Sequence, residues 1–304
     1  MAKEFTVIHT LDESVRVQRG SVVLLEYHYA PDVPQYESPK PYIDPLATPL
    51  GDVVTLDRPH DHLWHRGLYF GWAHVNDNNF WGGPTYVRGE GYRGLDNNGS
   101  QVHEAWERLE RSDDGVWMVE RLAWYSFGGE RWIDERRTLR VHPLASENEL
   151  LLTVVTELTP HGDQGPFVFG SPTTNGRPNA GYSGLTLRMQ RSMNDGRIVL
   201  STGQEGPDVM GQRGAWLHFA GRLDTTNQPV CVATFDHPAN PRHPTKFFVR
   251  NNPFGVINPA FCFDEEYVLE KGETLTLRYG VWVRRGEEDL ARVAQVYRGW
   301  AEGA

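Results

Sequence analysis

The sequence predicts an all-β protein: a large two-sheet, mainly antiparallel β-sandwich that forms one domain over residues 1–304 and ends in a helix at about residues 287–301. Three observations predict this class. Apolar and polar residues alternate with a period of two along most of the chain. The 31 glycines and 20 prolines provide many turns, and the 10 tryptophans, 12 tyrosines and 13 phenylalanines favour half-buried strands. Strand-like and helix-like runs do not alternate, which argues against a parallel sheet.

The expected strands are short and follow one another from the N-terminus. We expect them at residues 5–9, 15–17, 22–27, 67–75, 102–110, 116–124, 132–141, 150–158, 185–189, 198–200, 216–219, 230–235, 246–250 and 260–263. The clearest hairpin is expected over residues 267–283, where Lys271-Gly272 would form the turn between two alternating strands.

Two segments depart from this pattern. Residues 30–49 contain six prolines, so they should form an ordered loop rather than a regular ladder of backbone hydrogen bonds. Residues 287–289 are acidic and suit the positive end of a helix dipole. The residues that follow form an apolar stripe at helical spacing, which should pack on a sheet: Leu290, Val293, Ala294, Val296, Tyr297 and Trp300.

The composition disfavours several classes of function. A formal charge of −10 would repel nucleic acid and anionic lipid. The chain has no apolar run of roughly 20 residues, and its first residues lack the apolar core of a signal peptide, so we expect a cytoplasmic protein. Cys231 and Cys262 lie in apolar runs and are expected to be buried free thiols. Without a Gly-rich phosphate loop, a Gly-x-Ser-x-Gly elbow or a Cys-x-x-Cys pair, we expect no nucleotide cofactor.

The densest polar segment, residues 57–68, contains the candidate catalytic residues His60, His62, His65 and Arg66. On an extended segment His60 and His62 project to one side, and a turn at Leu63-Trp64 would bring His65 round to them. Neutral imidazoles at this spacing could share one divalent metal ion, or could act as acid and base on a sugar. The alternative is that the three histidines are partly buried and merely form hydrogen bonds, without a role in chemistry.

Other segments combine aromatic rings with amides and arginines, the mixture that suits a sugar ligand. We expect these side chains to lie with the histidines on one concave surface, although each segment alone could be a surface turn or ordinary core. The candidate substrate-binding residues are Tyr42, Trp72, Asn76, Trp81, Asn175, Arg177, Tyr182, His237, Asn240 and Arg242.

Several motifs resemble those of a bacterial family of unknown function labelled "methane oxygenase PmoA-like", and the resemblance covers nearly the whole chain. That label does not indicate the activity, because a membrane-bound copper monooxygenase subunit would need transmembrane helices. The motifs are Pro41-Tyr42-Ile43-Asp44-Pro45-Leu46, Thr48-Pro49-Leu50-Gly51, Asp61-His62-Leu63-Trp64-His65-Arg66-Gly67-Leu68, Asn76, Phe80-Trp81, Glu135-Arg136-Arg137-Thr138, Gly181-Tyr182-Ser183-Gly184-Leu185 and His237-Pro238-Ala239-Asn240-Pro241-Arg242.

Residues 269–273 also resemble the closing strands of galactose-mutarotase-like proteins, which implies a β-supersandwich with a carbohydrate cleft. Mutarotases use two histidines and a glutamate. His62 and His65 could stand for the histidines, but residues 248–252, where the glutamate is expected, contain no carboxylate.

Three functions agree with these observations. The first is an enzyme that acts on a sugar or an oxidised keto sugar as a lyase, an epimerase or a glycoside-cleaving enzyme, with a metal or Arg66 stabilising an enolate. The second is a non-catalytic carbohydrate-binding or sensing protein. The third, a metal-dependent oxygenase, would need three histidines and a carboxylate around iron. In each case we expect a small carbohydrate as partner rather than nucleic acid or a membrane, and an assembly of identical chains stays open.

Overall fold

The computed structural model describes residues 5–143 and 146–303, which form two eight-stranded sheets, two small sheets and one α-helix. The first large sheet has the order β1-β2-β3-β4-β5-β14-β19-β18. Its strands are β1 (Phe5–Thr10), β2 (Ser14–Arg19), β3 (Val22–His28), β4 (Tyr42–Leu46), β5 (Leu68–Trp72), β14 (Ser183–Arg188), β19 (Val256–Pro259) and β18 (Phe247–Arg250).

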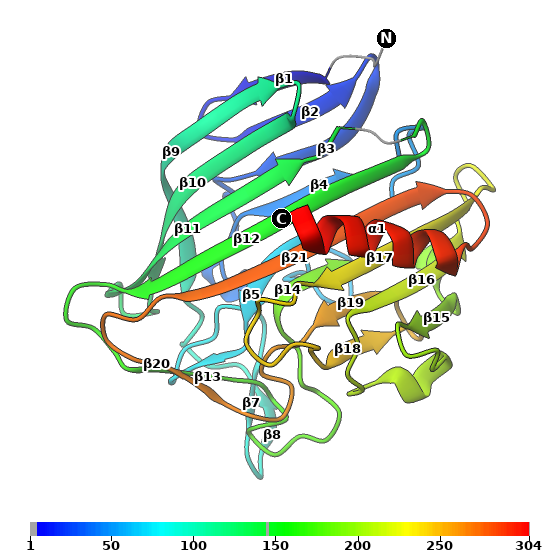
Figure 1. The fold of residues 1–304 in the computed structure, drawn as a ribbon. Coiled ribbons are helices and arrows are strands. Elements are labelled where there is room, and N and C mark those ends of the chain that lie inside the picture. The colour runs from blue at the N-terminus through cyan, green and yellow to red at the C-terminus, as the bar shows by residue number, and fades with distance from the viewer. Residues whose placement is uncertain (1–4, 144–145, 304) are drawn as a thin grey trace.

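The second large sheet has the order β15-β16-β17-β21-β12-β11-β10-β9, and the paired strands of both sheets run antiparallel (Figure 1). Its strands are β15 (Arg197–Leu200), β16 (Trp216–Arg222), β17 (Pro229–Asp236), β21 (Leu275–Arg285), β12 (Glu149–Pro160), β11 (Arg131–Val141), β10 (Gly115–Tyr125) and β9 (Ser100–Ser112). The predicted two-sheet antiparallel sandwich with one C-terminal helix is confirmed.

The remaining elements are short. A three-stranded sheet joins β20 (Tyr267–Leu269), β13 (Phe167–Gly170) and β6 (His74–Val75). The hairpin of β7 (Thr85–Val87) and β8 (Gly91–Arg93) projects from the end of the molecule at the bottom of Figure 1. Three 3₁₀ turns lie at Gln35–Glu37, Arg191–Met193 and Gly206–Val209.

Three expectations about the strands were wrong. Residues 267–283 are not a hairpin. β20 pairs with β13 in the three-stranded sheet, whereas β21 lies between β12 and β17 in the second large sheet. Residues 260–263 form a buried turn instead of a strand. The proline-rich segment 30–49 does contain a strand, β4, which pairs with β3 and β5 at only a few positions and so tolerates its proline.

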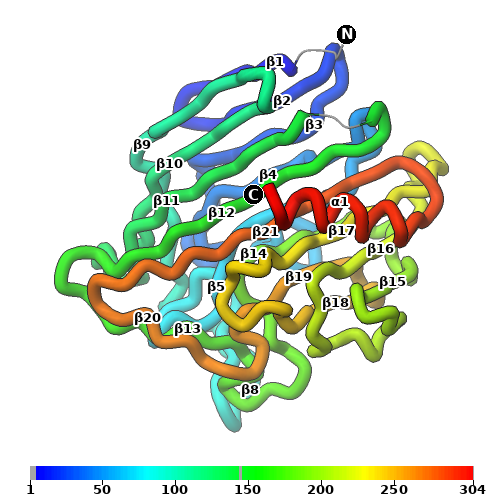
Figure 2. Tube along the Cα trace, in the orientation of Figure 1, coloured from blue at the N-terminus to red at the C-terminus, as the bar shows by residue number. Residues whose placement is uncertain are grey.

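Helix α1 (Leu290–Gly303) lies across the outer face of the second sheet, over β17 and β21, as Figures 1 and 2 show. It begins three residues later than expected because the side chain of Asp289 accepts a hydrogen bond from the backbone N–H of Arg292 at 2.9 Å and thereby caps the helix. No helix in the described part of the chain is both long and apolar enough to cross a membrane.

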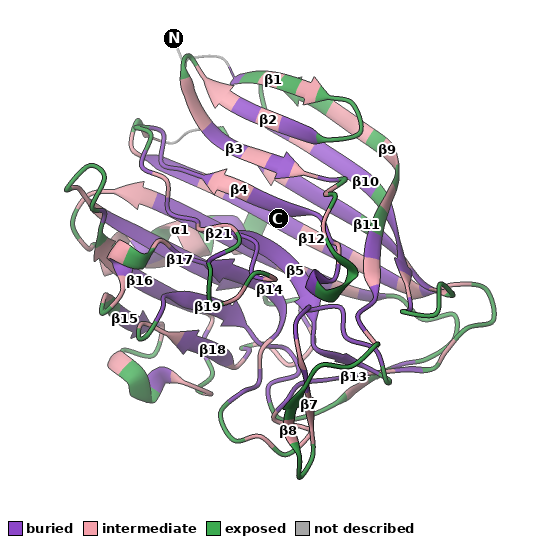
Figure 3. Cartoon of the chain, turned by 180° about the vertical axis from the view of Figure 1, so that it is seen from behind, coloured by how far each residue is buried: buried purple, intermediate pink, exposed green. Residues whose placement is uncertain are grey.

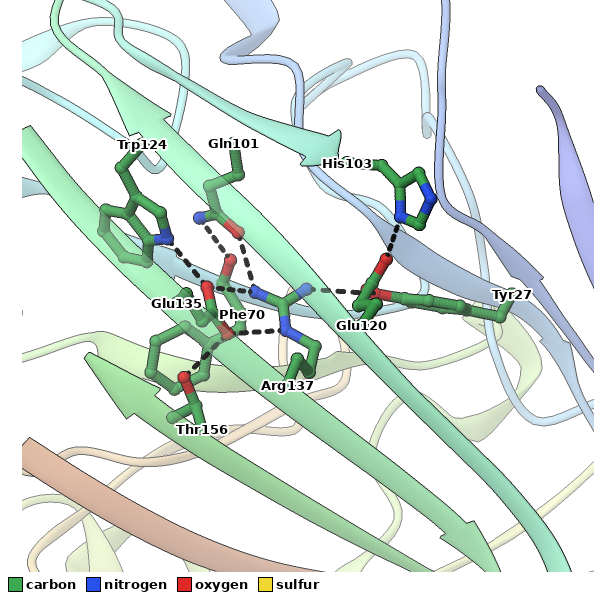
Figure 4. A network of polar contacts seen from close by, with 9 residues as sticks. All are labelled: Tyr27, Phe70, Gln101, His103, Glu120, Trp124, Glu135, Arg137 and Thr156. Atoms are coloured by element: carbon green, nitrogen blue, oxygen red, sulfur yellow. Dashed lines mark hydrogen bonds and ion pairs between the residues drawn. The ribbon is translucent and has the colours of Figure 1, made fainter. Parts of the chain in front are cut away.

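Buried residues are concentrated on the strands where the two sheets face each other (Figure 3). Cys231 and Cys262 are buried free thiols, as expected. One polar network also lies in this core (Figure 4): Arg137 contacts Glu135, Gln101 and Tyr27, which come from β11, β9 and β3. Buried polar groups that are fully paired in this way are compatible with a stable core.

Candidate functional site

A cleft of about 420 Å³ opens beside the end of the first sheet that carries β14, β19 and β18. Aromatic side chains form most of its wall, and we call it the aromatic cleft. Its lining residues are His62, Trp64, His65, Trp81, Gly82, Pro84, Tyr92, Arg177, Tyr182, Phe248, Arg250, Pro253, Phe254 and Val256. None of them is an aspartate or a glutamate. The volume lies within the range of sites that hold small molecules.

The loop before β5 brings His62 and His65 together. The backbone N–H of His65 donates to the carbonyl of His62 at 3.0 Å, which closes the turn predicted at Leu63-Trp64. The two imidazole centroids lie 4.7 Å apart. The loop ends at Gly67, whose φ is 56° and where a Cβ atom would lie 2.4 Å from the carbonyl oxygen of Ile43. Only glycine fits that position.

Asp61 lies next to the ring of His62. Its Oδ2 lies 3.1 Å from Nδ1 of His62, and its Oδ1 accepts a hydrogen bond of 2.5 Å from Arg191. This carboxylate favours a proton on Nδ1, so we assign the unprotonated, basic nitrogen of His62 to Nε2. Burial lowers the pKa of His62, and Asp61 opposes that shift.

His65 lies deeper in the molecule than His62. Its exposed fraction is 5%, against 32% for the His62 side chain. Burial, together with the neighbouring His62 and Arg188, lowers the pKa of His65 well below its usual value. At neutral pH His65 is therefore an uncharged imidazole.

Buried polar atoms without partners among the described residues lie next to the lining of the aromatic cleft. Arg188 of β14 is fully buried, and none of its three guanidinium nitrogens has a hydrogen-bond partner among the described residues. Its nearest carboxylate oxygen, Asp61 Oδ2, is 3.7 Å away, and its guanidinium lies 3.8 Å from the ring centroid of Phe254. Burial lowers the pKa of Arg188 to about 10. The hydroxyl of Tyr69 and Nδ1 of His65 are unpartnered in the same part of the structure.

The opposite wall is a chain of aromatic contacts. The ring of Trp81 lies 4.6 Å from that of Tyr182, and the hydroxyl of Tyr182 is 2.8 Å from that of Tyr92. Arg177 donates a hydrogen bond to the Tyr92 hydroxyl, so the β7–β8 hairpin and the loop of residues 171–182 meet at the rim. Burial raises the pKa of Tyr182 well above its usual value, so this phenol keeps its proton at neutral pH.

The three clustered histidines do not form the expected metal site. His60 does not line the aromatic cleft, and its Nδ1 lies 3.5 Å from Nη2 of Arg191, the arginine that bonds Asp61. Within residues 5–143 and 146–303, no three histidine, cysteine, aspartate or glutamate side chains converge as metal ligands. The residues present therefore do not fit a shared metal ion, and no chemistry here is assigned to one.

Arg66 and Tyr42 lie behind the aromatic cleft instead of in its wall. Both are buried, with the guanidinium of Arg66 4.1 Å from the ring centroid of Tyr42. Nε of Arg66 lies 3.0 Å from Asp57, and Nη1 lies 3.5 Å from Glu37. These contacts fix the loop that precedes β5. Arg66 is therefore not positioned to stabilise an enolate in this cleft.

Trp72, Asn76 and Asn175 also lie away from the aromatic cleft. Trp72 is a core residue whose indole N–H donates to the carbonyl of Gly170 at 2.9 Å. The side-chain oxygen of Asn76 accepts from the backbone N–H of Val168, and Asn175 donates to His74. Their polar groups are used to join loops, which removes them from the expected concave surface.

His237, Asn240 and Arg242 form a separate turn after β17. The ring of His237 packs 5.3 Å from that of Trp300, and Asn240 bonds both backbone groups of Arg278. Arg242 donates to the carbonyls of residues 261, 265 and 266. All three side chains close loops, and the expectation that they lie beside His62 is corrected.

The structure thus brings together five of the expected residues, His62, His65, Trp81, Arg177 and Tyr182. It adds aromatic and cationic wall residues that the sequence analysis did not select: Trp64, Tyr92, Phe248, Arg250 and Phe254. One signal pointed to Arg250, because it ends an apolar strand just before the Asn251-Asn252-Pro253 turn, and strand ends often carry binding residues.

Comparisons with known proteins give distant likenesses. No protein of curated function matches the sequence. A heparan sulfate lyase of Pedobacter heparinus is 9% identical, with 94% of this chain and 36% of that chain covered and a TM-score of 0.41. A protein of Synechocystis is 10% identical, with 93% of this chain and 96% of that chain covered and a TM-score of 0.41. A galactose mutarotase related enzyme of Lactobacillus acidophilus is 11% identical, with 93% of this chain and 97% of that chain covered and a TM-score of 0.25.

The chain spans little more than a third of the length of the lyase, and at these TM-scores none of the three likenesses carries an argument about activity. The family assignment is firmer, because one family model matches residues 14–298. That range includes every residue of the aromatic cleft. The chain belongs to the family described as "Family of unknown function (DUF6807)".

Proposed function

We propose that this protein is a carbohydrate-active enzyme of the lyase or epimerase type, in which His62 removes a proton from a carbon beside a carbonyl or carboxyl group of a bound sugar derivative. One observation carries the proposal: an imidazole with a carboxylate 3.1 Å from its Nδ1 stands in a cleft that has aromatic walls and, among the described residues, no carboxylate in its lining. A histidine base beside a carboxylate is typical of acid–base sites.

Two tryptophans support a sugar as the ligand. Trp64 and Trp81 both line the aromatic cleft, and flat indole faces suit the apolar C–H side of a sugar ring. Trp64 can pack there because residue 83 is glycine, where a Cβ atom would lie 2.4 Å from the Trp64 ring.

The lining residues offer an acid as well as a base. His62 would take the proton, and the electron pair would pass to the carbonyl oxygen as an enolate. The phenol of Tyr182 would then donate its proton, either to the opposite face of the carbon in an epimerisation or to the oxygen that leaves as a carbon–carbon double bond forms. A hydroxyl has one donor and two acceptor sites, so the single bond to Tyr92 leaves Tyr182 able to contact a ligand.

The same lining residues disfavour hydrolysis of a glycosidic bond by the usual route. That route needs two carboxylates about 5 to 10 Å apart on either side of the bond. Because no described aspartate or glutamate lines the cleft, we do not extend the proposal to glycoside hydrolysis.

Proton exchange with solvent tests the proposal without a known product. The protein would be incubated in D₂O with neutral sugars, uronates and keto sugars, and the C–H signals followed by NMR. We expect a substrate to lose a C–H signal or gain a vinyl signal, and His62→Gln to slow this by about a hundredfold or more without changing the melting temperature. His161→Gln, at an exposed histidine outside the cleft, is the matched control.

Two results would contradict the proposal. Full exchange activity in His62→Gln would remove His62 from the chemistry. Sugar binding without exchange or elimination for any member of the panel would favour the alternative, a non-catalytic carbohydrate-binding protein.

A further inference from the structure

Two arginines face the aromatic cleft without a counter-ion. Neither Arg177 nor Arg250 forms an ion pair within the described chain. Arg177 bonds the Tyr92 hydroxyl and lies 4.7 Å from the centroid of that ring. Arg250 lies 5.3 Å from the ring centroid of Phe248. Both guanidinium groups are held by neutral aromatic surfaces, which leaves their charges uncompensated.

The aromatic wall also holds these two charges near each other. Tyr92 contacts Tyr182, whose ring is 5.4 Å from that of Phe248, so Arg177 and Arg250 are joined through three aromatic side chains. Burial, followed by the positive charge of Arg177, lowers the pKa of Arg250. Two cations that repel each other in a partly desolvated site raise the free energy of the ligand-free protein.

Arginines elsewhere in this acidic protein behave differently. Arg131 contacts both Glu104 and Asp134, and Arg136 contacts Glu107 and Glu157. With a net charge of −10, carboxylates are plentiful on the surface. Among the described residues, the lining of the aromatic cleft contains Arg177 and Arg250 but no carboxylate, which favours an anionic ligand there.

Arg188 adds a third positive charge behind the cleft residue Phe254. It is fully buried beneath Phe254, and its Nε, Nη1 and Nη2 have no hydrogen-bond partner among the described residues. The one carboxylate near it in the described part of the chain, that of Asp61, already accepts a hydrogen bond from Arg191 and lies close to His62. Arg188 does not itself line the cleft, so its positive charge would act on a bound anion from behind Phe254.

We infer that the ligand of the aromatic cleft is a sugar acid, whose ring packs on the tryptophans and whose carboxylate is bound by Arg177 and Arg250. The planar guanidinium group donates two parallel hydrogen bonds to a carboxylate, which favours this anion. The inference rests on the proposed function and names its substrate class. It also agrees with the chemistry, because a neutralised carboxylate acidifies the C–H bond beside it.

Equilibrium binding tests the inference independently of turnover. Titrations followed by tryptophan fluorescence or calorimetry would compare D-galacturonate and D-glucuronate with galactose, glucose and glucose 6-sulfate. We expect the uronates to bind at least about tenfold more tightly than the neutral sugars. Arg177→Gln and Arg250→Gln should each weaken uronate binding by about tenfold or more and weaken the binding of neutral sugars by much less.

The matched control is Arg298→Gln, which removes the same charge from an exposed position on α1 and should not change uronate binding. Wild-type protein provides a second measurement that needs no variant. Uronate affinity should fall as salt is raised from low concentration to about 0.5 M, while the affinity for neutral sugars stays constant.

Three outcomes decide between the explanations. Equal binding of uronates and neutral sugars, or salt-independent uronate binding, would overturn the inference. Tighter binding of glucose 6-sulfate than of the uronates would overturn the assignment of a carboxylate. Arginine-dependent uronate binding without solvent exchange would support the inference while contradicting the proposed chemistry, so the two can fail separately.

Discussion

At the scale of single residues, Arg137 shows how a buried charge is tolerated in this fold. Its Nε and Nη2 bond the carboxylate of Glu135 at 2.7 and 2.9 Å, and Nη2 also donates to Gln101 at 2.8 Å. Glu135 in turn accepts from Trp124 and Thr156 (Figure 4). Every polar group of this pair has a partner, unlike those of Arg188.

We predict that Arg137→Met will destabilise the protein by about 3–5 kcal/mol, because it leaves the Glu135 carboxylate buried without its cation. Adding Glu135→Gln should recover part of that loss, since the amide is neutral and can still bond its neighbours. Denaturant unfolding measures both. Arg136→Met, at the exposed neighbour, should cost no more than about 1 kcal/mol. A double variant less stable than Arg137→Met would contradict this account.

At the scale of elements, α1 shows which predictions a periodic pattern supports. Its apolar stripe does pack on the second sheet, with Val293 and Trp300 buried against Phe235 and Trp282. Trp300 also donates its indole N–H to Thr153 at 2.8 Å. The spacing of the sequence predicted this face correctly because helical periodicity is a local property.

We predict that Trp300→Ala will lower stability by about 3–5 kcal/mol, because it removes a large buried ring together with its hydrogen bond to Thr153. Sugar binding by the folded protein should not change, since α1 covers the outer face of the second sheet and contributes nothing to the cleft lining. Thermal unfolding and binding of the same sample check both statements. A loss of binding in fully folded Trp300→Ala would show coupling that this structure does not provide.

Strand pairing was harder to predict than strand position. Residues 267–283 alternate as a hairpin should, yet β20 and β21 enter different sheets. An alternating pattern indicates that one face of a strand is buried, but it carries no information about which strand lies alongside. β21 finds partners in β12 and β17, about 120 and 50 residues away in sequence, and only the assembled core selects them.

At the scale of the whole molecule, the difference between local sequence patterns and contacts set by the assembled core also explains which site residues could be predicted. His62, His65, Trp81, Arg177 and Tyr182 stood out because each lies in a local segment rich in polar or aromatic residues. The wall residues Tyr92, Phe248, Arg250 and Phe254 come from strands and turns without such a signature. Conversely, Trp72 and His237 have side chains suited to a sugar site, but Trp72 lies in the core and His237 packs against Trp300 of α1. Side-chain direction depends on packing that one sequence does not reveal.

Buried neutral histidines link single side chains to the stability of the whole fold. Burial lowers the pKa of His74, His142 and His218 to about 4. An unfolded chain protonates its histidines near pH 6.5. Between pH 6.5 and pH 4 the unfolded state therefore binds more protons than the folded state, and stability falls as the pH is lowered through this range.

His218 allows this to be tested at one site. It is fully buried on β16, and neither ring nitrogen has a hydrogen-bond partner among the described residues, although Glu288 lies 3.4 Å from Nδ1 and Arg197 and Arg284 are near. A pKa of about 4 in the folded state implies a loss of about 2 kcal/mol between pH 7.5 and pH 5 from this residue alone.

We predict that His218→Phe will remove that part of the pH dependence. The phenyl ring has a similar shape and needs no hydrogen bonds, and its cross-strand neighbours Val199 and Ala233 are apolar, so stability at pH 7.5 should change little or rise. Denaturant unfolding of both proteins at several pH values gives the difference curve, in which the contributions of His74 and His142 cancel. A difference that stays constant from pH 7.5 to pH 5 would mean that His218 titrates alike in the folded and unfolded chain.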